Sequence, residues 1–210
     1  MALLSWKGNK IEDLELVRIY SYLEKKFSFN PKDIFVEILP LREFEDLYVR
    51  EKKEKAPWFV VGYALSNGRI VILSKDDFPK KEHSPNEFEK VACHEMCHIF
   101  VRRILWPKTT FRWIEEGVCE YFSFGSIDKP LENIISFNNL RTKEQWRKNP
   151  AYSQSREFFS FLDRTFGTKK IVDWIKKIKE KSEEDAFEEI FEIPLKEAQK
   201  TFLEVSSKQL

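Results

Sequence analysis

Residues 84–105 read SPNEFEKVACHEMCHIFVRRIL, and this stretch decides the fold that we expect. Ser84 can cap a helix, Pro85 suits its first position, and Glu87 can close a capping box. Pro107 then ends the helix, because proline lacks the backbone N–H that a helix interior requires. The sequence therefore predicts one long, well-capped helix over these residues.

Inside this helix, residues 94–98 read HEMCH, an H-E-x-x-H sequence. His94 and His98 are four residues apart, so their rings share one helix face and can reach a single ion. Zinc binds nitrogen and oxygen ligands tetrahedrally, and a catalytic site keeps one position for water. Glu95 can take a proton from that water, whose pKa zinc lowers to about 7. The alternative is a pair of histidines that only pack or face solvent.

A third ligand is expected in residues 113–121, which read WIEEGVCEY. The 17 residues between His98 and Glu116 are enough for a helix end, a turn and a return to the same site. Gly117 costs a helix about 1 kcal/mol relative to Ala, and close approach of two backbones is a reason for it. Glu115 is the alternative ligand; it lies about 100° around the helix, so only one of the two carboxylates can face the metal.

Glu120 lies one helical turn beyond Glu116, on the same face. Its carboxylate can accept the free ring N–H of a ligating histidine, with His94 preferred, and so fix the tautomer of that ring. The alternative interpretation of residues 113–121 is an amphipathic helix with an acidic face.

Apolar patterns before residue 84 predict a small sheet and two helices. Residues 58–65 and 69–74 predict a hairpin, because Asn67-Gly68 suits a two-residue type I′ turn. The other expected elements are a helix at 11–27, a strand at 34–39, a short helix at 41–48 and polar connections at 50–55 and 75–83.

The residues after 105 predict helices alone. Gly167 is placed to end one of them. The expected helices are 110–123, 131–147, 154–166, 169–181 and 194–207. Strands therefore gather in the first half of the chain and helices in the second, a pattern typical of an α+β fold.

Composition limits the function classes. The chain has 210 residues, 42% of them hydrophobic, which is enough for a core in one domain or in two lobes around a cleft. Charged residues make up 34% but the net charge is +1, so nothing favours nucleic acid or an anionic membrane as a partner. No apolar run approaches the length of a membrane span. Three cysteines make no disulfide framework, and we expect a reducing cytoplasm.

The segments HEMCH and WIEEGVCEY resemble the gluzincin metallopeptidases, whose pattern is HExxH followed by a helix carrying W-x-x-E-G-x-A-x-Y. Residues 151–167 and 182–202 are similar to later segments of the peptidase-MA-like branch, in which a Phe-containing helix leads to a short loop and a final helix. The matches span about residues 90–202. Cys119 stands where the family has Ala, and the interval before Glu116 is short for such enzymes.

The resemblance implies a single zincin-like catalytic domain over 1–210. Residues 1–105 would form a lobe with a small twisted sheet and the active-site helix, and residues 106–210 an all-helical lobe that supplies the third ligand. It further implies one zinc ion (Zn²⁺) and a hydrolase that cleaves a peptide or protein substrate. We expect an extended peptide to lie in the cleft against an edge strand of the hairpin region. The ligands and general base implied are His94, His98, Glu116 and, as the base, Glu95.

Tyr152 is the candidate for hydrogen bonding to the oxyanion, since such enzymes commonly use a Tyr or His for this purpose; the alternative is a packing tyrosine. His83 is expected to be exposed in a polar loop. Two other functions remain open. One is a zinc-binding zincin-fold protein that is non-proteolytic or self-inhibited by its C-terminal segment, and the other is an interaction module without metal.

Overall fold

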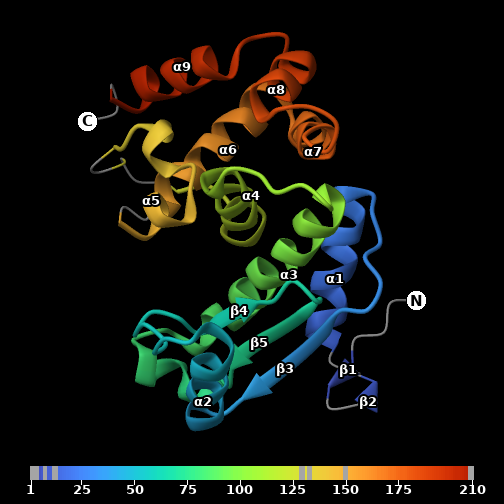
Figure 1. Cartoon of the computed structure of the whole chain (residues 1–210), viewed down its shortest axis with the longest axis vertical. Helices are drawn as coiled ribbons and strands as arrows, with labels where there is room; N and C mark the ends of the chain where they lie inside the picture. The colour runs from blue at the N-terminus through green and yellow to red at the C-terminus, as the bar shows by residue number, and fades with distance from the viewer. Residues whose placement is uncertain are drawn as a thin grey trace. The chain divides into compact units, whose positions relative to one another are not determined.

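The computed structural model describes residues 5, 6, 9, 10, 14–127, 131, 134–148 and 151–207. Over these residues the fold is α+β, as predicted, with strands in the first half and helices through the second (Figure 1). The chain divides into two compact units, 1–100 and 101–210, with the division inside helix α3. That the whole forms one zincin-like catalytic domain stays a prediction.

The first unit is built on a mixed sheet of strand order β2-β1-β3-β5-β4. Strands β1, β3 and β5 are parallel, and the two edge strands, β2 and β4, run antiparallel to their neighbours. The elements are β1 (Ser5–Trp6), β2 (Asn9–Lys10), α1 (Leu14–Phe27), β3 (Phe35–Leu39), α2 (Leu41–Lys52), β4 (Gly62–Ala64), β5 (Arg69–Leu73), the 3₁₀ helices η1 (Lys75–Lys81) and η2 (Pro85–Glu87), and α3 (Phe88–Leu105).

Helices α3 and α2 cover opposite faces of this sheet. Successive residues of a strand point to opposite faces. A Cβ atom on Gly62 in β4 would meet side chains of α3, whereas the ring of Tyr63 packs against Phe44 and Tyr48 of α2, with centroid distances of 5.6 and 5.2 Å. Helix α1 lies beside α3, where Tyr20 contacts Phe100 at 5.5 Å. The predicted active-site helix is therefore supported by both the sheet and α1.

The hairpin between β4 and β5 differs from the predicted two-residue type I′ turn. Leu65 N–H donates to the carbonyl of Arg69 at 2.8 Å, which leaves three residues in the loop. Gly68 N–H donates to the carbonyl of Leu65 at 3.2 Å, and Gly68 has a φ of 90° while Asn67 is not left-handed. A three-residue loop that ends in a left-handed glycine fits this geometry. The hairpin was predicted correctly, but its turn type was not.

Helix α2 continues to Lys52, past its predicted end at residue 48 and into the stretch expected to be a connection. Pro40, at the N-cap, offers no side chain that can cap the helix. Instead, Oδ2 of Asp77 in η1 accepts the N–H of Leu41 at 2.8 Å and the hydroxyl of Ser74 at 3.0 Å. Residues 75–83, predicted as a polar loop, therefore contain a 3₁₀ helix that caps α2.

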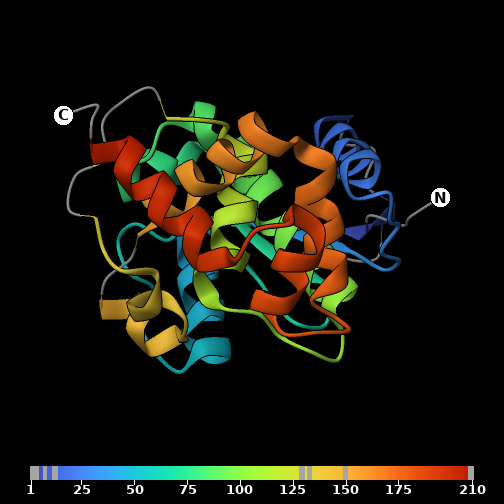
Figure 2. The ribbon, with the colours of Figure 1, turned by 90° about the horizontal axis from the view of Figure 1, so that it is seen from above.

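Every regular element in the described residues of the second unit is a helix, and these helices surround an aromatic core. Phe159 stacks on Trp174 at 5.8 Å, and Phe158 contacts Phe202 at 5.4 Å. Its elements are α4 (Arg112–Phe124), η3 (Phe137–Leu140), α5 (Lys143–Lys148), α6 (Tyr152–Phe166), α7 (Thr168–Lys177), α8 (Glu183–Phe191) and α9 (Leu195–Ser207), and Figure 2 shows the last four in sequence from orange to red.

Three details of this unit bear on the predictions. Gly167 ends α6, as expected, with a φ of 87°. The single helix expected at 131–147 is instead η3 followed by α5; residues 132 and 133 lie outside the described part. Helices α8 and α9 occupy the segment in which the resemblance implied a Phe-containing helix, a short loop and a final helix.

Gly117 allows α4 and α6 to pack closely. A Cβ atom at this position would lie 2.8 Å from the ring of Phe159 and 3.0 Å from Cβ of Ser155. The cost of glycine in a helix is thus offset by close packing. The neighbour is a side chain of α6, however, and not the backbone that the sequence suggested.

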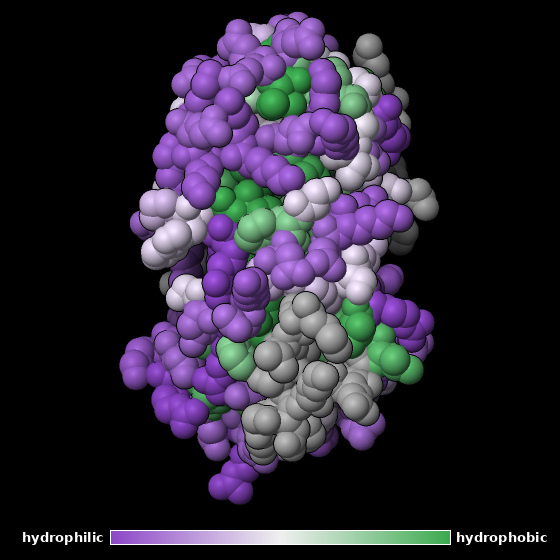
Figure 3. All heavy atoms as spheres, turned by 90° about the vertical axis from the view of Figure 1, so that its right-hand side faces the viewer, coloured by the Kyte–Doolittle hydropathy of each residue, from purple (hydrophilic) through white to green (hydrophobic). Residues whose placement is uncertain are grey.

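The surface shown in Figure 3 is mostly hydrophilic, with hydrophobic residues in small groups. Surface charges pair locally, for example Lys177 with both Glu180 and Glu189 at 2.8 and 2.9 Å. In the described part of the chain, no helix combines the length and the apolar character needed to cross a bilayer. Cys93, Cys97 and Cys119 are buried and form no disulfide, as small apolar core residues would.

Candidate metal centre

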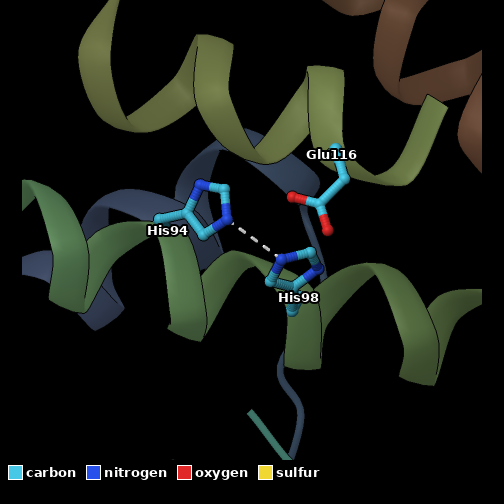
Figure 4. A group of neighbouring side chains, drawn as sticks. All are labelled: His94, His98 and Glu116. Atoms are coloured by element: carbon cyan, nitrogen blue, oxygen red, sulfur yellow. Dashed lines mark hydrogen bonds between the residues drawn. The ribbon is translucent and has the colours of Figure 1, made fainter. Parts of the chain in front are cut away.

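The centre consists of two rings on α3 and one carboxylate on α4. His94 Nε2 and His98 Nε2 are 3.0 Å apart, as expected for residues one helical turn apart. Glu116 joins them, and the ligand atoms that the three residues offer all lie within 4.8 Å of one another. In Figure 4 the two rings turn their nitrogens toward each other, and the carboxylate points toward them. The three residues are 9%, 3% and 2% exposed.

This donor set fits a single divalent ion. Ligands at zinc bond lengths of about 2.0–2.1 Å in a tetrahedron are about 3.3 Å from one another, close to the distance between the two ring nitrogens. Two nitrogens and one oxygen fill three positions and leave a fourth for water or substrate. Imidazole and carboxylate also bind other first-row metals. The geometry therefore supports a metal centre, and zinc as the ion is a proposal.

Glu115, the alternative third ligand, faces a different set of groups. Its Oε1 accepts a hydrogen bond from Nε of Arg102 at 2.7 Å, and its Oε2 lies 3.5 Å from Nη1 of Arg112. The group near the two histidines contains Glu116 and not Glu115. This is the outcome expected if only one of two successive helical residues can face the site.

Glu95 lies against the edge strand β4. It is half-buried, and a Cβ atom on Gly62 would lie 3.1 Å from its Cγ and 3.6 Å from its Oε1. The glycine thus lets the strand pass directly over the carboxylate side chain. Because Glu95 follows His94 in the helix, the candidate base and the first candidate ligand are held by the same turn of α3.

Tyr152 is the first residue of α6, half-buried, with its ring 4.9 Å from that of Trp146. Burial is the main cause that raises the pKa of Tyr152 to about 12, and the negative charge of Glu116 is the second cause. The hydroxyl therefore keeps its proton at neutral pH and can donate a hydrogen bond. The effect of Glu116 also indicates that this hydroxyl lies in the neighbourhood of a candidate ligand.

Glu120 lies near Arg156 of α6, with Oε2 3.8 Å from Nη1. The guanidinium of Arg156 also lies over the ring of Phe124, 5.7 Å from its centroid. These contacts tie the end of α4 to α6. A hydrogen bond from the ring of His94 to Glu120 stays a prediction.

His83 was expected to be exposed, and this was wrong. Its side chain is half-buried: Nδ1 lies 2.7 Å from a carboxylate oxygen of Glu87, and Nε2 lies 3.0 Å from the carbonyl of Phe59. The carboxylate of Glu87 thus contacts the side chain of His83, whereas in the predicted capping box it would accept the backbone N–H of Ser84. His83 connects the last residue of η2 to the segment that precedes β4.

Arg112 is the residue near the centre that sequence reasoning missed. It begins α4, and its Nη2 forms an ion pair with Oε1 of Glu116, one helical turn ahead. The spacing of four residues was a usable signal, but Arg112 lies one residue before the motif that starts at Trp113.

No family model, no curated protein and no solved structure matches this chain. What the site can do must therefore be argued from its own residues.

Proposed function

We propose that this protein is a zinc-dependent metallopeptidase of the gluzincin type, with a zincin-like fold. One observation carries the proposal: His94, His98 and Glu116 are buried and offer ligand atoms within 4.8 Å of one another. An H-E-x-x-H helix with a carboxylate from the following helix is the arrangement that such hydrolases use. The two histidine ligands, the glutamate ligand and the neighbouring Glu95 together supply the groups that hydrolysis requires.

The chemistry is divided among the residues of the chain. A bound zinc ion supplies Lewis acidity and lowers the pKa of water to about 7. The carboxylate of Glu95 takes the proton of the attacking water and passes it to the leaving amine. The Tyr152 hydroxyl donates a hydrogen bond to the carbonyl oxygen as negative charge develops on it.

The test separates metal binding from hydrolysis. Purified full-length protein is analysed for zinc, and cleavage of a peptide mixture is followed by mass spectrometry. Glu95→Gln keeps the size of the side chain but cannot take a proton, so it should bind zinc as tightly as the wild type and cleave nothing. Full cleavage by Glu95→Gln would exclude Glu95 as the base.

The same experiment distinguishes the alternatives. Zinc in the wild type without cleavage of any peptide supports a non-proteolytic or self-inhibited zincin-fold protein. Deleting the C-terminal segment is not a clean test of self-inhibition, because Phe187 and Phe202 belong to the core of the second unit. If the wild type binds no zinc at all, both the metallopeptidase and the non-proteolytic or self-inhibited zinc-binding protein are excluded.

A further inference from the structure

Arg112 holds the carboxylate of the candidate third ligand. Its Nη2 pairs with Oε1 of Glu116, while Nη1 lies 3.5 Å from Oε2 of Glu115. The side chain of Arg112 is 27% exposed, whereas that of Glu116 is 2% exposed. Arg112 therefore reaches from the surface of the second unit to a carboxylate that is otherwise enclosed.

Helix stability does not explain this arrangement. Arg112 is the first residue of α4, where the helix dipole disfavours a positive charge. The pair also has the cation before the anion along the helix, which is the less stabilising order at a spacing of four residues. Because neither the helix dipole nor the order of charges favours a cation at residue 112, its interaction with Glu116 needs another explanation.

The contact has a direct consequence for the two oxygens of Glu116. A charge-assisted bond to a guanidinium is strong and directional, and it fixes the orientation of the carboxylate. With Oε1 paired to Arg112, a metal ion would be bound through Oε2. Binding through one oxygen keeps a coordination position open for water or substrate, whereas binding through both oxygens would fill it.

We propose that Arg112 is a positioning residue, which holds Glu116 through Oε1 so that this ligand binds the metal ion through one oxygen only. The proposal rests on the metal centre of the proposed function. It assigns Arg112 no contact with substrate; the residue acts through Glu116.

The experiment measures metal binding by the full-length chain. Zn²⁺ affinity is determined by chelator competition for the wild type, Arg112→Gln, Arg112→Lys and the control Arg102→Gln. Arg102 is the matched control because its Nε donates to Oε1 of Glu115, the neighbouring carboxylate of the same network. In a separate measurement, the visible absorption spectrum of each protein with bound Co²⁺ is recorded. Co²⁺ absorbs more strongly in four-coordinate than in five-coordinate sites, so the spectrum reports the coordination number. Circular dichroism of the metal-free proteins verifies folding.

We expect Arg112→Gln to lose about 10- to 100-fold in Zn²⁺ affinity, the usual effect of removing a group that orients a ligand. Its Co²⁺ spectrum should weaken as Glu116 becomes free to bind through both oxygens. Arg112→Lys keeps the charge but not the planar fork, so it should lose less affinity and is the variant to rely on if Arg112→Gln does not fold. Arg102→Gln should match the wild type.

If the wild type binds Zn²⁺, three results would overturn the role of Arg112 without affecting the proposed function. Unchanged affinity in both Arg112 variants shows that Arg112 does not position the ligand. Tighter binding shows that the arginine competes with the metal for Glu116. An equal loss in Arg102→Gln assigns the effect to the network as a whole. If the wild type binds no Zn²⁺, the proposed function fails and takes this inference with it.

Discussion

Gly62 and Glu95 are in such close contact that a single methyl group at residue 62 would collide with the candidate general base. The added Cβ atom would lie 3.1 Å from Cγ of Glu95, and 2.9 Å from Cγ1 of Val91 one turn earlier in α3. The contact with Val91 would force a shift, and the contact with Glu95 would require its side chain to give by a few tenths of an ångström. The absence of a side chain at residue 62 therefore fixes where the Glu95 carboxylate lies relative to β4.

Gly62→Ala should reduce kcat by up to about 10-fold, because Glu95 must give by a few tenths of an ångström, and a misplacement of about 1 Å costs about 100-fold. Zn²⁺ affinity should stay unchanged, because the atoms nearest to an added Cβ at residue 62 belong to Val91 and Glu95 and not to a proposed ligand. The second variant, Gly62→Ala/Val91→Ala, removes the collision with Val91 and leaves the one with Glu95. It should recover stability in urea unfolding but not kcat, with Val91→Ala alone as the control. A double variant with full kcat would show that Gly62 serves packing only.

Zinc should stabilise the protein through the three proposed ligands. A ligand that binds only the folded state adds about 2.7 kcal/mol when present at a hundred times its Kd. We expect Zn²⁺ to raise the Tm of the wild type, a chelator to reverse this, and His98→Ala to abolish the response. His83→Ala is a matched control, because His83 bonds Glu87 and Phe59 and lies outside the group. An equal rise in Tm for His98→Ala would place the bound zinc elsewhere.

Asp77 gives the first unit a stability that depends on pH. The ion pair with Lys80 and the hydrogen bond from Leu41 N–H hold the pKa of Asp77 below its usual value. A carboxyl whose pKa is lower in the folded state contributes stability above its unfolded pKa of about 3.9, and this contribution is lost as pH falls through the folded value. Asp77→Asn should therefore unfold at lower urea than the wild type at pH 7.

The difference between Asp77→Asn and the wild type should begin to shrink as pH falls below about 3.9, the unfolded pKa, and should close as pH falls through the lower folded pKa. Urea midpoints followed from neutral pH down through this acidic window measure this. Asp76→Asn is the control, because the neighbouring side chain is exposed and does not cap α2. A gap between Asp77→Asn and the wild type that is constant over this range would mean that the Asp77 charge contributes nothing.

Local chemistry explains what the sequence predicted correctly. The spacing of His94 and His98 is a property of one helix, so it was visible without any tertiary information. The hairpin, and the end of α6 at Gly167, are equally local. The prediction of Glu116 as the third ligand required one assumption about tertiary structure, namely that the following helix packs back against the helix of His94 and His98. Gly117, which now packs against Phe159, gave that assumption a physical basis.

The features that were missed depend on contacts between distant residues. Leu41 and Asp77 are 36 positions apart, so no local pattern could assign Asp77 as the cap of α2. His83 was expected to be exposed because its partners, above all the carbonyl of Phe59, carry no sequence signal. Arg112 differs from these, since its spacing from Glu116 was readable. It was overlooked because, from sequence alone, an arginine at the start of a helix is expected to be an ordinary surface residue.

Tyr152→Phe should lower kcat by about 100-fold, the usual cost of losing one hydrogen bond to the oxyanion. The substitution removes only the hydroxyl oxygen and keeps the ring that packs against Trp146, so Zn²⁺ affinity and Tm should hold. Tyr121→Phe is the control: its hydroxyl donates to Asp163 at 2.5 Å, within the helical unit. Steady-state kinetics on one cleaved peptide separate kcat from KM. If Tyr152→Phe keeps the wild-type kcat, Tyr152 is a packing residue, and the oxyanion must be stabilised by another donor.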